Sequence, residues 1–365
     1  MPEPLPSLLA AAFAARGDLL ARLRAEGTDA YRLFHGTAEG RPGLAVDRYG
    51  DLLLVQSFHR PLAPEELAEL KGYYAGALPG LVAIYNDRSG AHSRVANELP
   101  TEDRAAAELP RIAREMGVAY RIQARHGGQD PWLFLDLRAG RRRVMGEAAG
   151  KSLLNLFAYT CGVGIAAAKA GARFVLNVDF AASSLRVGRD NARLNDLPFR
   201  PRFIEGPPQD SAAPTPPREG PGKLGAALCF IRSDAFAALR QLAGIGQPKR
   251  VRGKPMPPFP KLDARQFDLV FLDPPPYAKS PFGVVDLVND YPALFKPALL
   301  CTAEGGILYC CNNVAAVDRD AWLDQLRRSA RKAGRAIRDF EWIIPEADFP
   351  SPDGRPPLKM LALSV

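Results

Sequence analysis

One apolar segment of the chain is followed by an acid, prolines and an aromatic ring. Leu269–Leu272 is apolar, and it is followed by Asp273, Pro274, Pro275, a third proline and Tyr277. Because proline has a fixed φ and no N–H group, such a run makes a stiff turn with projecting carbonyl groups. The acid and the ring could then hold a planar nitrogen heterocycle by its edge and its face. A plain strand followed by a proline-rich loop is the alternative.

A turn of small residues lies upstream. A predicted strand at 152–157 is followed by a turn that contains Gly162 and Gly164, then by a helix and a second strand that ends in Asp179. Glycine permits close approach of the backbone, and a helix begins directly after the turn. Nucleotide-binding βαβ units place the acid that holds ribose hydroxyls at the end of the second strand. The pattern therefore predicts a cofactor site.

Two nucleotide cofactors could occupy such a site. A dinucleotide needs Gly-x-Gly-x-x-Gly around its pyrophosphate, but Ala167 stands at the third glycine position. S-adenosylmethionine has no phosphate, and it needs a ribose acid and an acceptor for the adenine amine. Asp234 follows another apolar run and could be that acceptor. Acids at three predicted strand ends, Asp179, Asp234 and Asp273, favour S-adenosylmethionine over NAD.

Six motifs carry a resemblance to a known family. They are Phe134-Leu-Asp-Leu-Arg138, Asn155-Leu-Phe-Ala-Tyr-Thr160, Asp190-Asn-Ala-Arg-Leu-Asn195, Ser233-Asp-Ala-Phe236, Asp273-Pro-Pro-Pro-Tyr277 and Asn312-Asn313. With these motifs, the chain from about Tyr31 to Val365 resembles the large-subunit ribosomal RNA methyltransferases of the RlmI and RlmK/RlmL group. Cys161 departs from the pattern, because these enzymes usually have glycine there. The helix expected at the start leaves no room for the RNA-binding PUA domain of RlmI-like members.

The resemblance implies an S-adenosylmethionine-dependent enzyme that methylates a base of large-subunit (23S) ribosomal RNA. Its motifs imply that the cofactor is bound by Asp136, Arg138, Asn155, Phe157, Tyr159, Thr160, Gly162, Gly164, Asp179, Phe180, Ser233, Asp234 and Ala235. They imply a catalytic centre made by Asp273, Pro274, Pro275 and Tyr277, which would hold the target base.

The prediction of the methylated atom depends on the role that is assigned to a pair of cysteines. A ring nitrogen such as guanine N7 has a lone pair, whereas carbon 5 of cytosine reacts only after a thiolate has added to the ring. Cys310 and Cys311 end a predicted central strand, so Cys311 could be that nucleophile. Buried cysteine usually acts as a small hydrophobe, and Asn312-Asn313 fits the RlmK-like pattern. We therefore expect a ring nitrogen and keep carbon 5 as the alternative.

Other classes of function stay open. A methyltransferase of this fold could act on a small molecule or a protein, and an inactive relative could bind only cofactor or RNA. The basic balance of the chain suits a polyanionic partner, since 48 Lys and Arg against 40 Asp and Glu give a net charge of +8.

The hydrophobic pattern predicts two domains. Residues 1–29 read as one amphipathic helix, and residues 30–125 as a small α+β domain that either positions RNA or serves as a packing platform. Its expected strands are 31–35, 44–47, 52–57, 81–85 and 120–124, with a helix at 64–78. Residues 126–150 are expected to link the domains.

Residues 151–365 alternate apolar strand-like runs with helices. Strands are expected at 152–157, 173–178, 228–231, 267–272 and 306–311, with a last one around Leu363 preceded by 340–344. This alternation predicts an α/β fold with a doubly wound, Rossmann-like parallel sheet that binds ligands at the carboxyl ends of its strands.

Two inserts and one basic run could contact RNA or be plain surface. The insert 206–225 is rich in Pro, Gly and Ser, and the insert 246–261 mixes basic residues with prolines. Phosphate contacts by an insert would release counterions. The candidate RNA-binding residues are Arg141, Arg142, Arg143, Lys249, Arg250 and Arg252.

The cysteine and histidine content indicates the cellular compartment and whether a metal site is expected. Five cysteines without framework spacing indicate a reducing, cytoplasmic compartment. The four histidines are scattered, so no metal site is expected. The chain has neither a signal peptide pattern nor the roughly 20 apolar residues of a membrane span. The sequence leaves the oligomeric state open.

Overall fold

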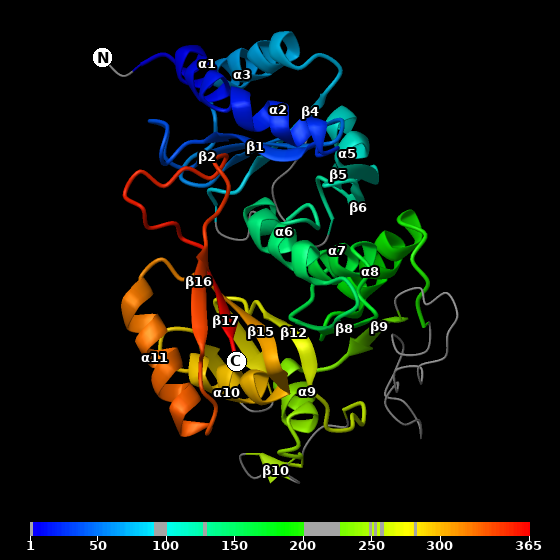
Figure 1. Ribbon diagram of the computed structural model, residues 1–365. Helices are drawn as coiled ribbons and strands as arrows, with labels where there is room; N and C mark the ends of the chain where they lie inside the picture. The colour runs from blue at the N-terminus through cyan, green and yellow to red at the C-terminus, as the bar shows by residue number, and fades with distance from the viewer. Residues whose placement is uncertain are drawn as a thin grey trace. The chain divides into compact units, whose positions relative to one another are not determined.

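The computed structural model describes residues 3–90, 101–126, 130–200, 227–247, 250–251, 254–255, 259–280 and 283–365. The chain divides into two compact units (Figure 1). Unit 1 comprises Met1–Arg138 and Pro345–Pro356, and unit 2 comprises Ala139–Ile344 and Pro357–Val365.

Unit 1 is built on a four-stranded sheet in the order β1-β2-β3-β4. The first three strands are antiparallel neighbours, and β4 lies parallel to β3 because α3 makes the crossover between them. Pro64 starts α3, and the Glu66 side chain accepts the Ala63 amide at 3.0 Å. The bounds are β1 Ala30–His35, β2 Leu44–Tyr49, β3 Leu52–Ser57, α3 Pro64–Ala77, β4 Val82–Asp87, α5 Thr101–Glu108, β5 Arg111–Glu115 and β6 Val118–Ile122.

The start of the chain forms two helices, so the prediction of one helix over 1–29 is wrong. Helix α1 (Leu5–Ala15) and helix α2 (Gly17–Ala25) are separated by Arg16. The Arg16 guanidinium is buried and donates to the carbonyl groups of Ala12 and Arg32. Leu9 and Leu23 pack into the apolar core of unit 1. The sequence pattern showed the apolar face but not the buried arginine at the break.

A segment near the carboxyl terminus completes unit 1. Asp348 is fully buried, its carboxylate accepts the Arg32 amide at 3.0 Å, and its other oxygen accepts Arg138 Nη2 at 2.5 Å. Arg138 also donates to Glu346 at 2.9 Å and to the carbonyl of Ala30 at 2.9 Å. Residues 345–356 therefore belong to unit 1, which differs from the second domain of 151–365 expected from the sequence.

The stretch expected to be a linker is mostly structured. A 3-10 helix at Leu135–Leu137 leads into α6 (Arg138–Glu147). The division between the units falls after Arg138, at the start of this helix. In the sequence, the arginine-rich segment Arg138–Arg143 was compatible with a solvated helix face, which was the one indication of helix α6.

Unit 2 contains a seven-stranded sheet in the order β16-β17-β15-β12-β7-β8-β9. The five strands β15, β12, β7, β8 and β9 are parallel, and β17 and β16 add antiparallel pairs at the edge beyond β15. Helices α6, α7 and α8 cover one face, and α9, α10 and α11 cover the other (Figure 1). The predicted doubly wound α/β fold is confirmed.

The elements of unit 2 largely match the predicted segments. The strands are β7 Ser152–Leu156, β8 Phe174–Asp179, β9 Ala227–Arg232, β12 Phe267–Leu272, β15 Thr302–Asn312, β16 Asp339–Ile343 and β17 Lys359–Ser364. The helices after α6 are α7 Gly162–Lys169, α8 Ala182–Leu194, α9 Ala235–Leu242, α10 Tyr291–Cys301 and α11 Arg319–Lys332. Two hairpins are made by β10 Arg250–Val251 with β11 Lys254–Pro255, and by β13 Tyr277–Ser280 with β14 Gly283–Asp286.

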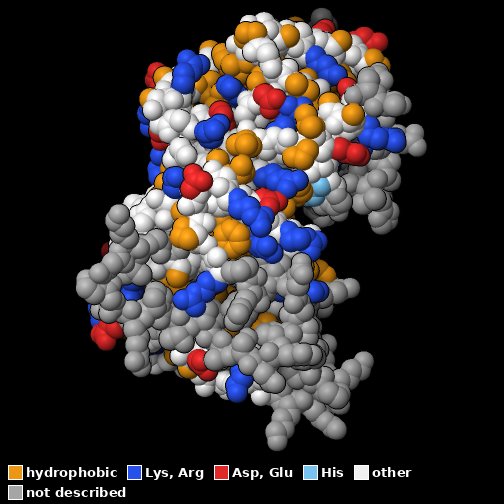
Figure 2. Space-filling view, turned by 90° about the vertical axis from the view of Figure 1, so that its right-hand side faces the viewer, with side chains coloured by type: hydrophobic (Ala, Val, Ile, Leu, Met, Phe, Trp, Pro, Cys, Tyr) orange, Lys and Arg blue, Asp and Glu red, His pale blue; other side chains and the backbone are white. Residues whose placement is uncertain are grey.

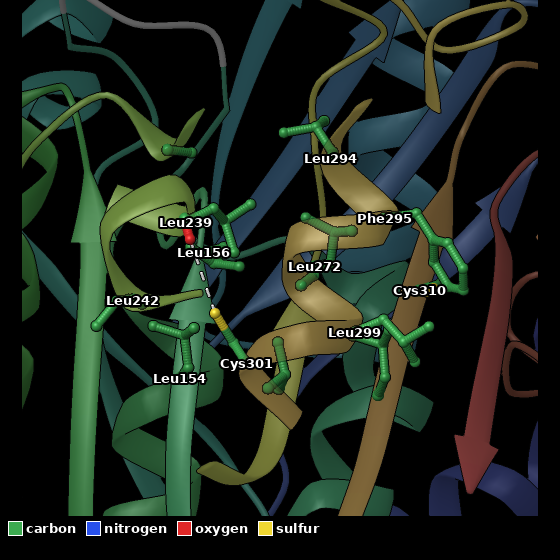
Figure 3. Close-up of a cluster of buried hydrophobic side chains, with 14 of the residues drawn as sticks. Leu154, Leu156, Leu239, Leu242, Leu272, Leu294, Phe295, Leu299, Cys301 and Cys310 are labelled. Atoms are coloured by element: carbon green, nitrogen blue, oxygen red, sulfur yellow. Dashed lines mark hydrogen bonds between the residues drawn. The ribbon is translucent and has the colours of Figure 1, made fainter. Parts of the chain in front are cut away.

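An apolar core of unit 2 lies between the sheet and the helices α9, α10 and α11. Leu154 and Leu272 from neighbouring strands meet Leu239 of α9 and Leu299 of α10 (Figure 3). The Cys301 thiol lies in this cluster and donates to the carbonyl of Leu239 at 3.8 Å (Figure 3). The packed face fixes the register of the strands, and with it the positions of the residues at their carboxyl ends.

The insert 206–225 lies outside the described residues. Of the insert 246–261, the backbone of the strands β10 and β11 and both ends of the segment are described. None of the helices in the described part of the chain has the length and apolar character that a membrane crossing requires.

Candidate functional site

The order of the strands places a topological switch point between β7 and β12. From β7 the chain proceeds outward through β8 to β9, and it returns to the opposite side of β7 with β12 and β15. Leu156, which ends β7, is the register partner of Leu272, which ends β12. Open α/β sheets bind ligands in the crevice outside the strand ends at such a point. The turn after β7 and the proline turn after β12 therefore leave the sheet side by side.

The turn after β7 holds three residues in the left-handed region. Phe157, Tyr159 and Cys161 have φ values of 54°, 48° and 64°, and none of them is glycine. Such conformations cost free energy in non-glycine residues and concentrate at ligand sites. Cys161 stands where glycine is usual in the resembling family, and its left-handed φ explains that preference. Its thiol is fully buried, and burial raises its pKa well above the ordinary range.

Asp179 ties this turn to the end of β8. Its carboxylate accepts the backbone amides of Tyr159 and Ala181, each at 2.8 Å. The side chain is buried, and burial raises its pKa although the accepted amides act against the shift. Each carboxylate oxygen has two lone pairs, so these bonds leave acceptor capacity toward ribose hydroxyls. Asp179 therefore fits the predicted role and also holds the turn.

Phe180 and the end of β9 lie next to Asp179. The Phe180 ring is 69 % exposed, although it directly follows a fully buried strand. The amide of Ser233 donates to the carbonyl of Asp179 at 3.0 Å, which joins the two strand ends. An exposed ring beside two acid-bearing strand ends suits a planar purine.

Asp234 caps helix α9. Its carboxylate accepts the amide of Ala237 at 3.0 Å, and burial raises its pKa. Ser233 is buried and donates its hydroxyl to the carbonyl of Asp234 at 3.1 Å, and Ala235 is buried in the first turn of α9. Asp234 thus has a structural role, and its role as acceptor for the adenine amine stays a prediction.

Asn155 and Gly164 are explained by a contact inside the protein. The Asn155 amide is buried and donates to the Asn177 side chain at 2.8 Å. A Cβ on Gly164 would lie 2.0 Å from the same Asn177 oxygen. The absence of a side chain at Gly164 is therefore required by Asn177, and its contact with the cofactor stays a prediction. Gly162 begins α7, and Thr160 is buried with its carbonyl accepting Asn191 at 3.1 Å.

The proline turn presents one ring to solvent. Asp273 and Pro275 are half-buried and Pro274 is buried, whereas the Tyr277 ring is 60 % exposed at the start of the β13–β14 hairpin. The predicted combination of an acid, a stiff turn and an accessible ring is therefore present at the switch point. An exposed ring at this place can stack on a planar base.

The cysteine pair at the end of β15 is buried. Cys311 is 1 % exposed and its carbonyl accepts the hydroxyl of Tyr291 at 3.1 Å. Burial raises the pKa of Cys310 to about 12. The Asn312 side chain is also buried, donating to the carbonyl of Leu287 at 3.4 Å and accepting the Val314 amide at 3.0 Å. A base could reach Cys311 only if neighbouring side chains moved.

Several residues that were predicted to contact the cofactor or RNA are buried or paired within the protein. Asp136 and Arg138 belong to unit 1, and the Arg138 guanidinium is buried between Glu346 and Asp348, so it has a structural role there, and its cofactor contact stays a prediction. Arg141 is buried, and a buried guanidinium cannot contact an RNA backbone. Arg143 pairs with Glu147 at 2.5 Å and with Glu341 at 2.9 Å.

The remaining basic candidates are less defined. Arg142 is half-buried. Lys249 and Arg252 lie outside the described residues, and of Arg250 only the backbone is described. Figure 2 shows basic side chains beside acidic ones over the described part of the face it draws. The six arginines and lysines predicted to bind RNA therefore do not form one described surface.

Two residues of the site were missed in the sequence. Tyr291 is fully buried at the start of α10 and bonds to the end of β15. Lys359 is buried at the start of β17, opposite Asn312, and donates to the carbonyl groups of Val314 and Pro357 at 2.9 and 3.0 Å. Burial lowers its pKa. Only the register of β15 with β17 brings Lys359 to this end of the sheet.

The donor set fits S-adenosylmethionine. A buried and a half-buried acid at adjacent strand ends, an exposed ring beside them and a strained turn between β7 and α7 match the ribose, the adenine and the amino-acid part of this cofactor. Among the residues that the structure describes, no three His, Cys, Asp or Glu side chains are grouped as a metal ion would require.

Known proteins resemble the chain along most of its length. A model of S-adenosylmethionine-dependent methyltransferases matches residues 31–201. Ribosomal RNA large subunit methyltransferase I of Aeromonas salmonicida is 27 % identical over 339 residues, which cover 90 % of this chain and 72 % of that protein. A ribosomal RNA large subunit methyltransferase of Deinococcus radiodurans is 28 % identical over 90 % of this chain and 71 % of its own length.

Solved structures agree on the fold. An S-adenosylmethionine-dependent methyltransferase from Streptococcus mutans superposes with a TM-score of 0.70 at 21 % identity, covering 99 % of this chain and 81 % of the other. One from Agrobacterium tumefaciens gives 0.55 at 16 % identity over 88 % of this chain and 87 % of the other. In its fold the chain is similar to solved S-adenosylmethionine-dependent methyltransferases, and in sequence it is similar to their family model over residues 31–201 and to ribosomal RNA large subunit methyltransferases over 90 % of its length.

Proposed function

We propose that the protein methylates a base of large-subunit ribosomal RNA. The observation that carries the proposal is the exposed Tyr277 ring on the proline turn, next to the cofactor turn at the switch point. A base that is extruded from its strand could stack on this ring, while Asp273 and the carbonyl groups of the turn contact its edge. The names of the relatives support ribosomal RNA as the source of that base.

The chain would act mainly by positioning. S-adenosylmethionine supplies an already activated methyl group on a sulfonium. Asp179 would accept the ribose hydroxyls, Asp234 the adenine amine, and Phe180 would cover the purine. Holding two reactants in line can contribute up to about 7–11 kcal/mol to the lowering of the barrier. Tyr277 and Asp273 would align the target atom with the methyl group.

A ring nitrogen is the favoured target. It already has a lone pair and asks no side chain to act as nucleophile. Carbon 5 of cytosine would require Cys311 as a thiolate, and the buried position of Cys311 argues against that role. The carbon-5 reaction remains the second candidate because Cys311 lies at the end of β15, one strand from the proline turn.

The proposal is tested on purified ribosomal RNA. The enzyme is incubated with 23S ribosomal RNA from a strain that lacks the gene, using cofactor with an isotopically labelled methyl group. Mass spectrometry of the nucleosides then identifies the base and the atom that carry the label. The expected result is one labelled base, absent with the Asp273→Ala variant. Label in protein or in small molecules alone would contradict the proposal.

A further inference from the structure

An arginine in unit 1 joins an exposed ring to an acid. The Arg88 guanidinium lies 5.2 Å from the ring centre of Phe58 and 3.3 Å from a carboxylate oxygen of Asp130. Phe58 is 41 % exposed directly after β3, and Arg88 directly follows the neighbouring strand β4. The ends of two parallel strands therefore present a cation stacked on a ring.

The contacts continue to a second ring and a second arginine. The carbonyl of Asp130 lies 2.5 Å from Nε2 of His126, whose ring centre is 4.6 Å from that of Trp132. The guanidinium of Arg121 lies 5.4 Å from the Trp132 ring. We call these six residues, Phe58, Arg88, Arg121, His126, Asp130 and Trp132, the Phe58–Trp132 surface.

The backbone holds Trp132 in an unfavourable conformation. Its φ is 72°, which is rare for an aromatic residue, and its amide donates to the carbonyl of Asp130 at 2.7 Å. Strain of this kind persists only where the surroundings fix it, and it concentrates at binding sites. The half-buried indole is thus kept beside His126 and Arg121 rather than turned into the core.

Arginines supply the cations of the surface. Arg88 pairs with Asp130, and the Arg121 guanidinium lies against the Trp132 ring. Arg125 adds a third guanidinium, which donates to the Asn86 side chain at 3.1 Å. Burial and the charge of Arg104 lower the pKa of Arg125, while Glu108 acts against the shift. A guanidinium beside an aromatic face can hold a phosphate next to a stacked base.

We propose that the Phe58–Trp132 surface binds a single-stranded segment of the RNA substrate. Sites for single strands combine aromatic faces, on which bases of any sequence stack, with cations that follow the phosphates. Both components are present here and alternate along one series of contacts. The inference rests on the proposed function, and it assigns to unit 1 a part in holding RNA that is distinct from the catalytic turn.

The first test measures the contribution of the rings. A fluorescein-labelled single-stranded RNA of 12 nucleotides and mixed sequence (a length of about one binding site) serves as the probe. The substitutions Phe58→Ala and Phe58→Leu should each weaken its binding roughly tenfold, because both remove the aromatic face and the second keeps apolar bulk. Ile112→Ala is the matched control, since Ile112 is 43 % exposed on β5 of the same unit. It should bind the probe as the wild type does.

The second test measures the contribution of charge. Arg121→Gln should lower the slope of log K against log salt by about 0.7 if one phosphate contact is lost. Arg114→Gln, a change at an exposed arginine of β5, is the control and should leave the slope unchanged. Calorimetric titration with S-adenosylmethionine and thermal unfolding of each variant confirm that the protein is folded.

The outcomes separate this inference from the proposed function. If the wild type methylates ribosomal RNA while the Phe58 and Arg121 variants match their controls, the Phe58–Trp132 surface has no role in binding RNA and the proposed function stands. If the wild type neither binds nor methylates RNA, both fail together.

Discussion

The carboxylate of Asp179 accepts the backbone amide of Tyr159 across 2.8 Å, which joins the end of β8 to the turn after β7. The same turn carries three left-handed non-glycine residues, so this bond holds a segment that would otherwise relax. Asp179 therefore shapes this turn, in addition to the ribose contact that we propose for it. Loss of the side chain should affect both.

Removal of the Asp179 carboxylate should weaken cofactor binding. In Asp179→Ala the S-adenosylmethionine affinity should fall by about 1.5–3 kcal/mol, the scale of hydrogen bonds to a charged group. Calorimetric titration measures the change. Asp324→Ala is the control, because Asp324 is an exposed acid on α11 of the same unit. Unchanged affinity in a folded Asp179→Ala protein would remove Asp179 from the site.

The acids at the ends of β8 and β9 should make cofactor binding sensitive to pH. Burial raises the pKa of Asp179 and Asp234 above the ordinary value of 3.8. Each carboxylate is therefore protonated more easily in the folded protein than in the unfolded chain, and binding that needs the carboxylates should weaken as pH falls from neutral toward those raised values. The free energy of unfolding should change in the opposite direction. Each carboxyl group lowers the stability of the fold at neutral pH, and this cost diminishes as pH falls through the folded pKa toward 3.8. Titrations between pH 7 and pH 4 test this, and Asp179→Asn should show a smaller pH dependence.

Gly164 should not tolerate a side chain. A Cβ would meet the Asn177 oxygen at 2.0 Å, and both residues are buried. Gly164→Ala should therefore lower the free energy of unfolding by about 1–3 kcal/mol. Gly146→Ala is the matched control, because Gly146 lies in α6 with nothing within 4 Å of its Cβ position. That change should be neutral or stabilise by about 0.5–1 kcal/mol. Urea unfolding compares the two, and equal stabilities would contradict the packing account.

The alternation of apolar strands and helices was enough to predict the sheet of unit 2. Leu269–Leu272 and the other central strands are buried on both faces, and such strands are continuous apolar runs in the sequence. The acids that end β8 and β12 were identified for the same reason, since the ends of apolar runs are visible. Local sequence patterns were therefore sufficient to predict the fold of unit 2 and the residues at the ends of its strands.

Contacts between segments that are far apart in the sequence could not be predicted from such local patterns. Arg138 looked like part of a cofactor motif, but its partners Glu346 and Asp348 lie about two hundred positions further on, at separations of 208 and 210 residues. The burial of Arg141 depends on how α6 packs, and the placement of Lys359 depends on a strand register. Charge in the sequence does not reveal whether a side chain faces solvent or a buried partner.

Asp348 should be among the residues most important for the stability of unit 1. It is fully buried, and it accepts both the Arg32 amide and the Arg138 guanidinium. Asp348→Ala would leave a buried arginine with one fewer counter-charge, which typically costs about 3–5 kcal/mol. The double change Arg138→Met with Asp348→Leu should recover part of that loss, because both members of the Arg138–Asp348 pair are removed, while Glu346 and Glu115 lose the charge of Arg138. Equilibrium unfolding of the wild type, of Asp348→Leu, of Arg138→Met and of the double variant measures the pattern, and additive losses would contradict it.

The choice between nitrogen and carbon chemistry rests on Cys311 and Tyr277. If the target is a ring nitrogen, Cys311→Ala should keep most of its methyl transfer activity, because the thiol only fills space at a position that is 1 % exposed. Tyr277→Ala should then be the more damaging change, through the loss of about 1–3 kcal/mol of base stacking. Tyr277→Phe, which keeps the aromatic face, should retain most of the activity.

The carbon-5 mechanism predicts the reverse for the cysteine. The thiolate would add to carbon 6 of the pyrimidine, so Cys311→Ala would abolish transfer, and RNA with 5-fluorocytosine at the target would trap the wild type as a covalent adduct. We expect no adduct, because a thiol in this position would first have to leave the buried end of β15 and lose its proton there. Mass spectrometry of enzyme incubated with the fluorinated RNA and cofactor decides the matter. An adduct at Cys311 would replace the nitrogen target with carbon 5 and leave the roles of Asp179 and Asp234 unchanged, since those concern the cofactor alone.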